Sequence, residues 1–279
     1  MQICKVDLKE KYGFLQGGTL DCLVTEYPYD DVQPDDWALP ALIVVPGGGY
    51  GMTSKREGFP IAMAFAARGF QTFVLNYLCQ PQGASYPEQL LEEAAAVDYV
   101  RKHAKQLHVN SKEIFLVGFS AGGHLVGNLS VEHQNVEQKA GVELDCKPTA
   151  VGLCYPVITH VGGHFGSYVN LLNGYSEEAK EELFKTLDLN EAVSEQTPPA
   201  FIWATATDNV VPADNALRYA LAMAKNGIAY EVHIYPEGAH GLSTGRLDVN
   251  MQLNDETVRT ARWVDDCACF FRRYTVEKY

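Results

Sequence analysis

The sequence predicts an α/β fold with a mostly parallel central sheet and helices on both of its faces. Short apolar runs alternate along the chain with segments of helical periodicity, which is the pattern of successive β-α-β units. Several of the apolar runs are continuous, as expected for parallel strands that are buried on both faces. The chain has 279 residues, of which 47% are hydrophobic, so we expect one large domain over residues 1–279.

The expected strands and helices follow one another in a regular order. The first forty residues are expected to form one or two antiparallel strands at the edge of the sheet. Buried strands are predicted at 41–48, 70–77, 113–119, 150–158, 199–206 and 230–236. Helices are predicted at 54–68, 91–107, 213–225 and 255–274, with a further helix beginning at Ser120. Residues 159–197 do not fit this alternation, and we expect them to form a small cap insertion over one face.

The charge balance disfavours some classes of partner. Lys and Arg number 22 against 35 Asp and Glu, so the formal net charge is −13. This excess repels the phosphates of nucleic acids and of anionic membranes, so we expect neither as a partner and favour a small neutral substrate. Residues 148–176 contain no Asp, Glu, Lys or Arg, but their prolines, histidines and glycines argue against a membrane-spanning helix. The oligomeric state stays open, with a homo-oligomer as one alternative.

The cysteines and the N-terminal segment indicate the compartment. The seven cysteines are odd in number and widely spaced, unlike the framework of a disulfide-rich secreted domain. Cys267 and Cys269 form a C-x-C pair, but in a helical pattern they face different sides, which argues against a shared metal ion. The first ten residues show no apolar core of a secretory signal. We therefore expect a cytoplasmic protein.

A lone serine among glycines lies between a predicted strand and a predicted helix. Gly118-Phe119-Ser120-Ala121-Gly122 matches G-x-S-x-G, and in this context the motif holds a nucleophile on a sharp turn. Side chains two residues before and two residues after the serine would collide, so both positions need glycine. The alternative is a small residue in a tight crossing of strand and helix.

A serine nucleophile needs a base, and the base needs an acidic group that orients it. His240 lies just past the last strand on a loop flanked by glycines, and Asp208 directly follows the strand before that one. Parallel sheets bind ligands at such carboxyl ends of their strands, and the order Ser, Asp, His is the usual one for this motif. Asp214 is the alternative acid, although it falls inside the next helix. His124, one turn after Ser120, is expected to pack or hydrogen-bond beneath the site.

Acyl transfer also needs hydrogen-bond donors for the oxyanion that develops. The run PGGGYG at 46–51 follows a predicted central strand and offers backbone N–H groups with no Cβ in the way, and the N–H of Ala121 adds another. A phosphate-binding loop is disfavoured because no Lys-Ser/Thr pair follows. The side chains that could line a substrate pocket are Tyr50, Tyr155, His160, His164, Phe165 and Tyr168.

Four parts of the chain, taken in sequence order, resemble the α/β-hydrolase superfamily. The segments that carry the resemblance are PGGGY at 46–50, GFSAGGH at 118–124, Asp208 with Val211-Pro212, and His240. The resemblance covers about residues 40–275 and is to the esterase branch, near hormone-sensitive-lipase-like enzymes and acetylxylan-esterase-like carbohydrate deacetylases. Pro46 stands where lipase-like members carry a histidine, which moves the resemblance toward the carbohydrate esterases.

The resemblance implies an α/β-hydrolase fold and a set of residue roles. The implied roles are nucleophile for Ser120, base for His240, orienting acid for Asp208, and oxyanion donors for Gly48, Gly49 and Ala121. It further implies a serine carboxylesterase for short-acyl esters, with an acetylated sugar as the expected substrate and with no metal or other cofactor. The alternatives are a prolyl-oligopeptidase-like serine peptidase and a non-catalytic α/β-hydrolase that acts as a binding protein.

Overall fold

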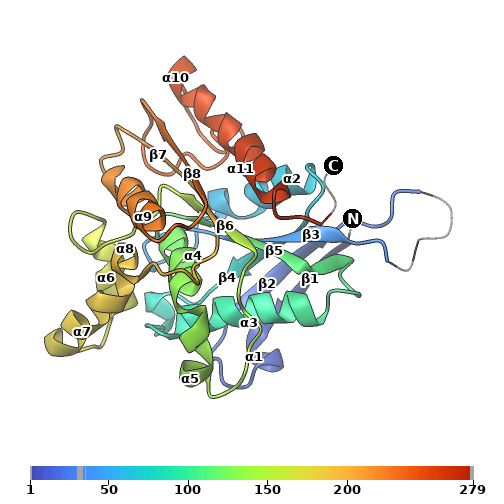
Figure 1. Ribbon diagram of the computed structural model, residues 1–279, viewed down its shortest axis with the longest axis horizontal. Helices are drawn as coiled ribbons and strands as arrows, with labels where there is room; N and C mark the ends of the chain where they lie inside the picture. Colours follow the sequence, from blue (N-terminus) through green and yellow to red (C-terminus); the bar gives the residue numbers. More distant parts are fainter. Residues whose placement is uncertain (1, 30–33, 35, 277–279) are drawn as a thin grey trace.

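The computed structural model describes residues 2–29, 34 and 36–276, and a single sheet forms its centre (Figure 1). Within these residues the sheet has eight strands in the order β1-β2-β4-β3-β5-β6-β7-β8. The strands are β1 (Gln2–Asp7), β2 (Thr19–Val24), β3 (Leu39–Val45), β4 (Gln71–Asn76), β5 (Val109–Phe119), β6 (Ala150–Cys154), β7 (Ala200–Thr205) and β8 (Tyr230–Tyr235). β2 pairs antiparallel with β1 and β4, and the remaining pairs are parallel. This confirms the mostly parallel sheet and its antiparallel N-terminal strands.

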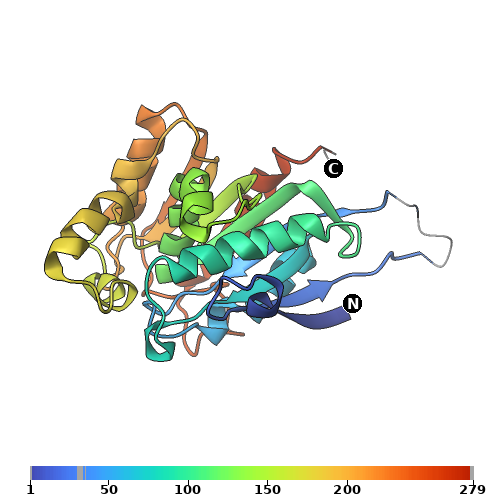
Figure 2. The ribbon, with the colours of Figure 1, turned by 90° about the horizontal axis from the view of Figure 1, so that it is seen from below.

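Helices cover both faces of the sheet, as predicted (Figures 1 and 2). α2 and α11 contact each other on one face, whereas α3 packs beside α4 and α9 lies against β7 and β8 on the other. The helices outside residues 159–197 are α1 (Leu8–Lys11), α2 (Phe59–Ala66), α3 (Glu88–Lys102), α4 (Ala121–Glu132), α5 (Val136–Ala140), α9 (Asp214–Lys225), α10 (Asp255–Val258) and α11 (Trp263–Arg272). Among the described residues, no helix is both long and apolar enough to cross a membrane.

The strand predicted at 150–158 ends early, at Cys154. Tyr155 has a φ of 37°, which takes the chain out of the extended conformation. Pro156 then follows, and it has no N–H to donate to a neighbouring strand. The chain therefore turns at Tyr155, close to the carboxyl end of the sheet.

Two predicted helices are interrupted in the structure. The helix predicted at 54–68 begins as a 3-10 turn at Lys55–Glu57 and continues as α2 only after Gly58. The helix predicted at 255–274 is divided by a 3-10 turn at Arg259–Arg262. Both segments are mainly helical, as predicted, but each contains a 3-10 turn in place of a continuous α-helix.

The core is built from the central strands and from aromatic side chains of the last long helix. Residues 41–45 of β3 are fully buried, which explains their continuous apolar run. On α11, Trp263 stacks on Trp203 of β7 with ring centroids 5.4 Å apart, and Phe271 stacks on Phe115 of β5 at 4.6 Å. Each such pair contributes about 0.5–1.5 kcal/mol beyond the burial of its area, so these rings hold α11 against the sheet.

The segment between β6 and β7 departs from the β-α-β alternation, as the sequence indicates. We call residues 159–197 the cap segment. It carries α6 (Phe165–Leu171), α7 (Glu177–Leu187) and α8 (Leu189–Ala192). Both views show these helices grouped at one end of the molecule, far from the N-terminus (Figures 1 and 2). α8 contacts α4 and α9, so the cap segment packs on the helix that follows Ser120.

Candidate active site

Ser120 lies on a sharp turn between β5 and α4. Its φ of 53° and ψ of −117° are rare for a residue with a side chain. The glycines on both sides leave room for this turn. A Cβ on Gly118 would lie 2.3 Å from the carbonyl oxygen of Gly122, and a Cβ on Gly122 would lie 2.3 Å from that of Val45. Both positions therefore need glycine, as the motif predicts.

The structure brings Ser120, His240 and Asp208 together. His240 Nε2 lies 2.8 Å from Ser120 Oγ, and His240 Nδ1 lies 2.6 Å from Asp208 Oδ2. The other carboxylate oxygen, Asp208 Oδ1, accepts hydrogen bonds from the backbone N–H groups of Val210 and Val211 at 2.9 and 3.0 Å. These bonds fix the fully buried carboxylate so that its free oxygen faces the imidazole.

The alternative acid has a different environment. Asp214 begins α9 and pairs with Arg218, one helical turn later, at 3.0 Å, and both side chains are about half exposed. An exposed pair in the first turn of a helix is accounted for by the helix dipole and by the i,i+4 spacing. Of the two candidate acids, the structure therefore places Asp208 against His240.

The glycine loop after β3 passes beside Ser120. Gly48 and Gly49 have φ values of 129° and 63°, which favour glycine, and a Cβ on Gly47 would lie 3.0 Å from Ser120 Cβ. In the described part of the chain, the N–H groups of Gly48, Gly49 and Ala121 make no hydrogen bond to protein acceptors. Ala121 is the first residue of α4, where a helix leaves its N–H groups unpaired. Three unpaired donors thus lie in the segments next to the serine hydroxyl.

Two of the six side chains predicted to line a substrate pocket, His164 and Phe165, lie at the start of α6 in the cap segment. His164 Nδ1 lies 2.9 Å from Ser167 Oγ, and its Cε1 would be 3.7 Å from a Cβ on Gly49. Partial burial lowers the pKa of His164, and the proximity of His240 lowers it further. Phe165 follows with 57% of its surface exposed. Both residues therefore remain candidates for substrate contact.

Tyr50 is placed differently from the prediction. Its ring is 1% exposed, and its hydroxyl lies 2.8 Å from His124 Nδ1. The ring therefore packs in the core beneath the glycine loop, which argues against Tyr50 as a wall of the substrate pocket.

His160 is engaged within the cap segment. Its Nδ1 lies 2.8 Å from Asp188 Oδ2, and its ring stacks on Phe184 with centroids 4.1 Å apart. The side chain is about a quarter exposed. Its partners thus belong to the cap segment itself, and its hydrogen bond links the loop before α6 to Asp188, which directly follows α7.

His124 lies beneath the site, as predicted, and joins α4 to the cap segment. Its Nε2 lies 2.9 Å from the carbonyl oxygen of Leu187. Because a carbonyl only accepts, Nε2 carries the proton and Nδ1 accepts from the Tyr50 hydroxyl. Burial lowers the pKa of His124 to about 4, so the ring is neutral at pH 7.

Two further residues contact the site, and the sequence analysis missed them. Glu57, in the 3-10 turn before α2, accepts the N–H of Gly47 at 2.9 Å. Asn170, on α6, donates its amide to the carbonyl oxygen of Gly49 at 2.8 Å. Both act on backbone groups of the glycine loop. Backbone partners leave no residue-type signal, so only the three-dimensional structure could identify the pair.

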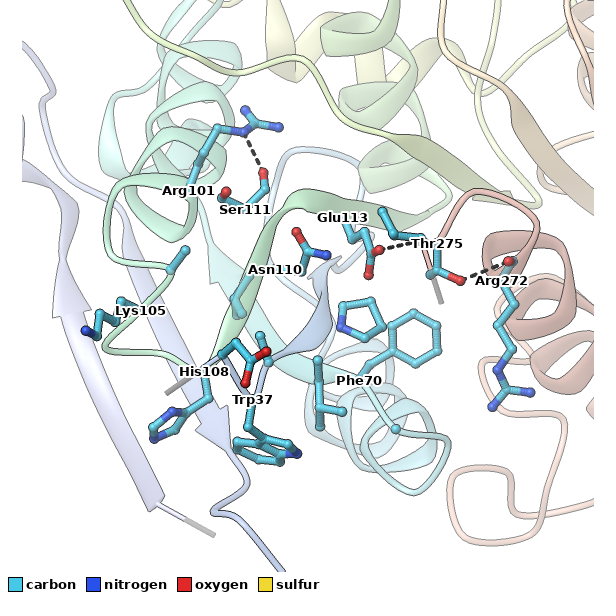
Figure 3. A pocket seen from close by; sticks show the side chains of 18 of the residues that line it. Trp37, Phe70, Arg101, Lys105, His108, Asn110, Ser111, Glu113, Arg272 and Thr275 are labelled. Carbon is cyan, nitrogen blue, oxygen red and sulfur yellow. Dashed lines mark hydrogen bonds between the residues drawn. The ribbon is translucent and has the colours of Figure 1, made fainter. Parts of the chain in front are cut away.

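A basic groove of about 1050 Å³ lies at the other end of the sheet (Figure 3). Leu39 and Val109, at the starts of β3 and β5, line it together with Trp37, Lys105 and Arg272. Ser120 follows the opposite end of β5, so the groove is separate from the candidate active site. Within the described residues, no cluster of three His, Cys, Asp or Glu side chains could hold a metal ion.

The chain is similar to known proteins over most of its length. The BD-FAE family profile matches residues 32–222. The chain is 34% identical over 218 residues to endo-1,4-beta-xylanase B of Butyrivibrio fibrisolvens, a match that covers 77% of this chain and 33% of that protein. It is 32% identical over 211 residues to an acetylxylan esterase of Xylanibacter ruminicola, covering 74% and 41%. The chain thus spans between a third and about two fifths of the length of these relatives.

Solved structures are similar over almost the whole chain. An acetyl ester-xyloside bifunctional hydrolase from Caldicellulosiruptor lactoaceticus is 30% identical with a TM-score of 0.81, covering 97% of this chain and 96% of that one. A carboxylesterase from Lactobacillus plantarum is 26% identical with a TM-score of 0.84, covering 98% of each chain. With its profile match, sheet order and serine turn, the chain belongs to the BD-FAE family and has the α/β-hydrolase fold.

Proposed function

We propose that the chain is a serine carboxylic-ester hydrolase for short-acyl esters and that its substrate is an acetylated carbohydrate. The observation that carries the proposal is the hydrogen-bonded series from Asp208 through His240 to Ser120, with Ser120 on a strained turn. A serine hydroxyl becomes a competent nucleophile when an oriented imidazole can take its proton.

The proposed reaction uses these three side chains in two steps. Ser120 Oγ attacks the ester carbonyl while His240 Nε2 takes its proton, and Asp208 stabilises the imidazolium through Nδ1. The alcohol leaves with the proton that His240 returns, and the acyl group stays on Ser120. A water molecule then attacks this acyl-enzyme while His240 takes its proton, and His240 returns that proton to Ser120 Oγ as the carboxylic acid leaves.

The developing negative charge on the carbonyl oxygen is assigned to the unpaired backbone donors. The N–H groups of Gly48, Gly49 and Ala121 are the proposed oxyanion donors, since they lie beside the serine and have no acceptor among the described residues. Such donors are preoriented for charge that appears only in the transition state, and losing one typically costs about 100- to 1000-fold in kcat.

The substrate class is supported by the relatives and by the cap segment. Two of the similar proteins are named an acetylxylan esterase and an acetyl ester-xyloside hydrolase. His164 of the cap segment lies near Gly49 and His240, so the segment borders the proposed acyl site. A segment of this length can wall off a short acyl group, which supports acetyl as the group removed.

Ester hydrolysis is tested with p-nitrophenyl acetate, butyrate and octanoate, run beside acetylated xylo-oligosaccharides. We expect kcat/KM for acetate to exceed that for octanoate by at least about ten-fold, together with acetate release from the oligosaccharides. Equal or faster hydrolysis of the octanoate would exclude the short-acyl assignment. Hydrolysis of p-nitrophenyl acetate without release from the oligosaccharides would exclude the carbohydrate assignment, and no hydrolysis at all would exclude the esterase.

We further propose that residues 1–279 form one domain with the cap segment as an insertion and that the protein is cytoplasmic. The seven cysteines are free thiols, five of them buried, which supports a reducing compartment. Limited proteolysis should leave one resistant body of nearly full length, and cell fractionation should recover the protein with the cytoplasm.

A further inference from the structure

Beneath the glycine loop lies a buried carboxylate that the proposed reaction does not use. Glu57 is only 5% exposed. Its two oxygens bind two different segments: Oε2 accepts the N–H of Gly47 at 2.9 Å, and Oε1 accepts the hydroxyl of Tyr155 at 2.7 Å. Burying a carboxylate costs free energy because it loses its hydration, and the two hydrogen bonds offset part of this cost.

The first bond acts on the loop of the proposed oxyanion donors. Gly47 directly precedes Gly48 and Gly49, and its Cα faces Ser120 so closely that an added Cβ would lie 3.0 Å from Ser120 Cβ. The bond from Gly47 to Glu57 fixes the peptide group between Pro46 and Gly47, and the peptide groups that carry the N–H groups of Gly48 and Gly49 follow directly after it.

The second bond acts on the loop of the proposed base. The Tyr155 ring contacts the His240 ring edge to face, with centroids 5.0 Å apart. The Tyr155 hydroxyl also accepts the N–H of Ser243, three residues after His240, at 3.0 Å. The carbonyl oxygen of Ser243 is held in turn by the indole N–H of Trp263 at 2.9 Å. Glu57 is thus connected through Tyr155 to the loop that carries His240.

The donors in this network match an ionised carboxylate. The Tyr155 hydroxyl already accepts from Ser243, so its own proton is available for Glu57, and the N–H of Gly47 can only donate. The pKa of Glu57 is raised overall, because burial is the largest influence on it, although the bonds from Tyr155 and Gly47 and the nearby His240 act in the opposite direction. Each donor has an acceptor only when the carboxyl group has lost its proton.

We propose that Glu57 is a positioning residue for the ester hydrolysis, a carboxylate that couples the oxyanion loop to the His240 loop. This inference rests on the function proposed above. Among the described residues, the carboxylate of Glu57 accepts hydrogen bonds from Gly47 and Tyr155, and Glu57 is not one of the proposed substrate contacts. It therefore governs kcat and leaves KM nearly unchanged.

The test compares Glu57→Gln with the matched control Glu113→Gln in hydrolysis of p-nitrophenyl acetate. Glu113 is also 5% exposed and also binds a backbone N–H, that of Val276, but it lies in the groove at the other end of the sheet. Glutamine keeps the size of the side chain but places an NH2 group against a donor, so one of the two bonds of Glu57 is lost. We expect Glu57→Gln to lower kcat by about ten- to a hundred-fold with KM within about two-fold. Glu113→Gln should stay within about two-fold in both constants.

Tyr155→Phe is the second variant, and it tests the proposed role of Glu57 if Glu57→Gln does not fold. It removes the hydroxyl and keeps the ring against His240, and it should show the same loss confined to kcat. In the double variant the two losses should not multiply, because both break one network.

The inference is overturned if the parent enzyme hydrolyses the ester while Glu57→Gln and Tyr155→Phe keep kcat within about two-fold. It is equally overturned if the loss appears in KM alone or if Glu113→Gln loses as much as Glu57→Gln. A parent enzyme that hydrolyses no ester overturns the proposed function, and this inference with it.

Discussion

Ser120 is held in its strained conformation by backbone bonds on both sides. Its N–H donates to the carbonyl oxygen of Cys154 at 3.0 Å, and its own carbonyl accepts from His124 and Val157 at 3.0 and 3.1 Å. Strain of this kind costs roughly 1–3 kcal/mol and persists only where the surroundings fix it. The turn is thus fixed by β6 and by the start of α4, which keeps the hydroxyl aligned with His240.

Asp208→Asn should lower kcat by roughly ten-thousand-fold with little change in stability. The amide keeps the shape of the side chain but loses the carboxylate that accepts His240 Nδ1–H and stabilises the imidazolium. Asp214→Asn is the matched control, because it neutralises a half-exposed carboxylate that pairs with Arg218, and it should leave activity within about two-fold. If Asp214→Asn loses most of its activity while Asp208→Asn is mildly affected, Asp214 is the orienting acid and the assignment of Asp208 is wrong.

His124 makes the stability of the fold depend on pH. Burial lowers its pKa to about 4 from 6.5, so below pH 6.5 the unfolded chain binds a proton that the folded chain does not. The free energy of unfolding therefore has its full value, as far as His124 is concerned, above pH 6.5. It decreases as the pH falls toward 4, by about 3 kcal/mol in total.

The measurement for His124 is the free energy of unfolding of the parent and of His124→Gln at pH 7.5 and pH 4.5. The variant should be the less stable protein at pH 7.5, since it disturbs the bonds to Tyr50 and Leu187. The gap between the two proteins should shrink at pH 4.5. A gap that stays constant over this range would refute the assignment of a neutral buried ring.

The residues that sequence could predict are those that directly follow a strand. Ser120, Asp208 and His240 each lie within a few residues of the end of a predicted strand, so their positions follow from the pattern of strands. Glu57 and Asn170 could not be predicted, because each binds a backbone group of the glycine loop, and a backbone partner leaves no signal in the residue types. A tyrosine beside a glycine loop can face either the pocket or the core, and only the packing places Tyr50 in the core.

At the scale of single elements, the central strands were predictable and several boundaries were not. The apolar runs of β3, β5 and β7 mark buried strands whatever their neighbours are. The early end of β6 depends on the backbone conformation of Tyr155, whose hydroxyl is bound by Glu57. Contacts between distant segments set such ends, so the local pattern does not contain them.

The cap helix α6 should set the acyl preference. Asn170 ties α6 to Gly49, and His164 lies beside the same loop, so the helix and the proposed oxyanion loop form one rim. His164→Ala and Phe165→Ala should each raise the ratio of octanoate to acetate kcat/KM by at least about three-fold. Lys185→Ala, on the exposed part of α7, serves as the control and should leave the ratio unchanged.

An unchanged ratio in both cap variants would remove His164 and Phe165 from the acyl site. It would leave the assignment of Ser120, Asp208 and His240 intact, because rates on the acetate are measured in the same panel. A change confined to one variant would assign the wall to that residue.

At the scale of the whole molecule, the order of the strands assembles the site. The sequence predicts which segments are strands, but not that β3 lies beside β5 and that β6, β7 and β8 follow it. This order brings the glycine loop, Ser120, Asp208 and His240 to neighbouring carboxyl ends of the sheet. Ligand sites at such ends are the general rule for parallel sheets, so the location was predictable although the order was not.

Activity should survive removal of metal ions. In the proposed reaction, groups of the chain itself supply the nucleophile, the base and the oxyanion donors, so the reaction requires no Lewis acid. Dialysis against a chelator should leave kcat/KM for p-nitrophenyl acetate unchanged within about two-fold. A loss that zinc or calcium restores would contradict this route.

The central claim is that one serine carries the acyl group, and labelling of Ser120 tests it most directly. A p-nitrophenyl phosphonate should react with one equivalent of enzyme, and mass spectrometry should place the label on Ser120. Acetate release should fall in proportion to labelling, and Ser120→Ala should take up no label while kcat drops about a million-fold. Label on another residue, or ester hydrolysis that continues in the fully labelled enzyme, would contradict the account.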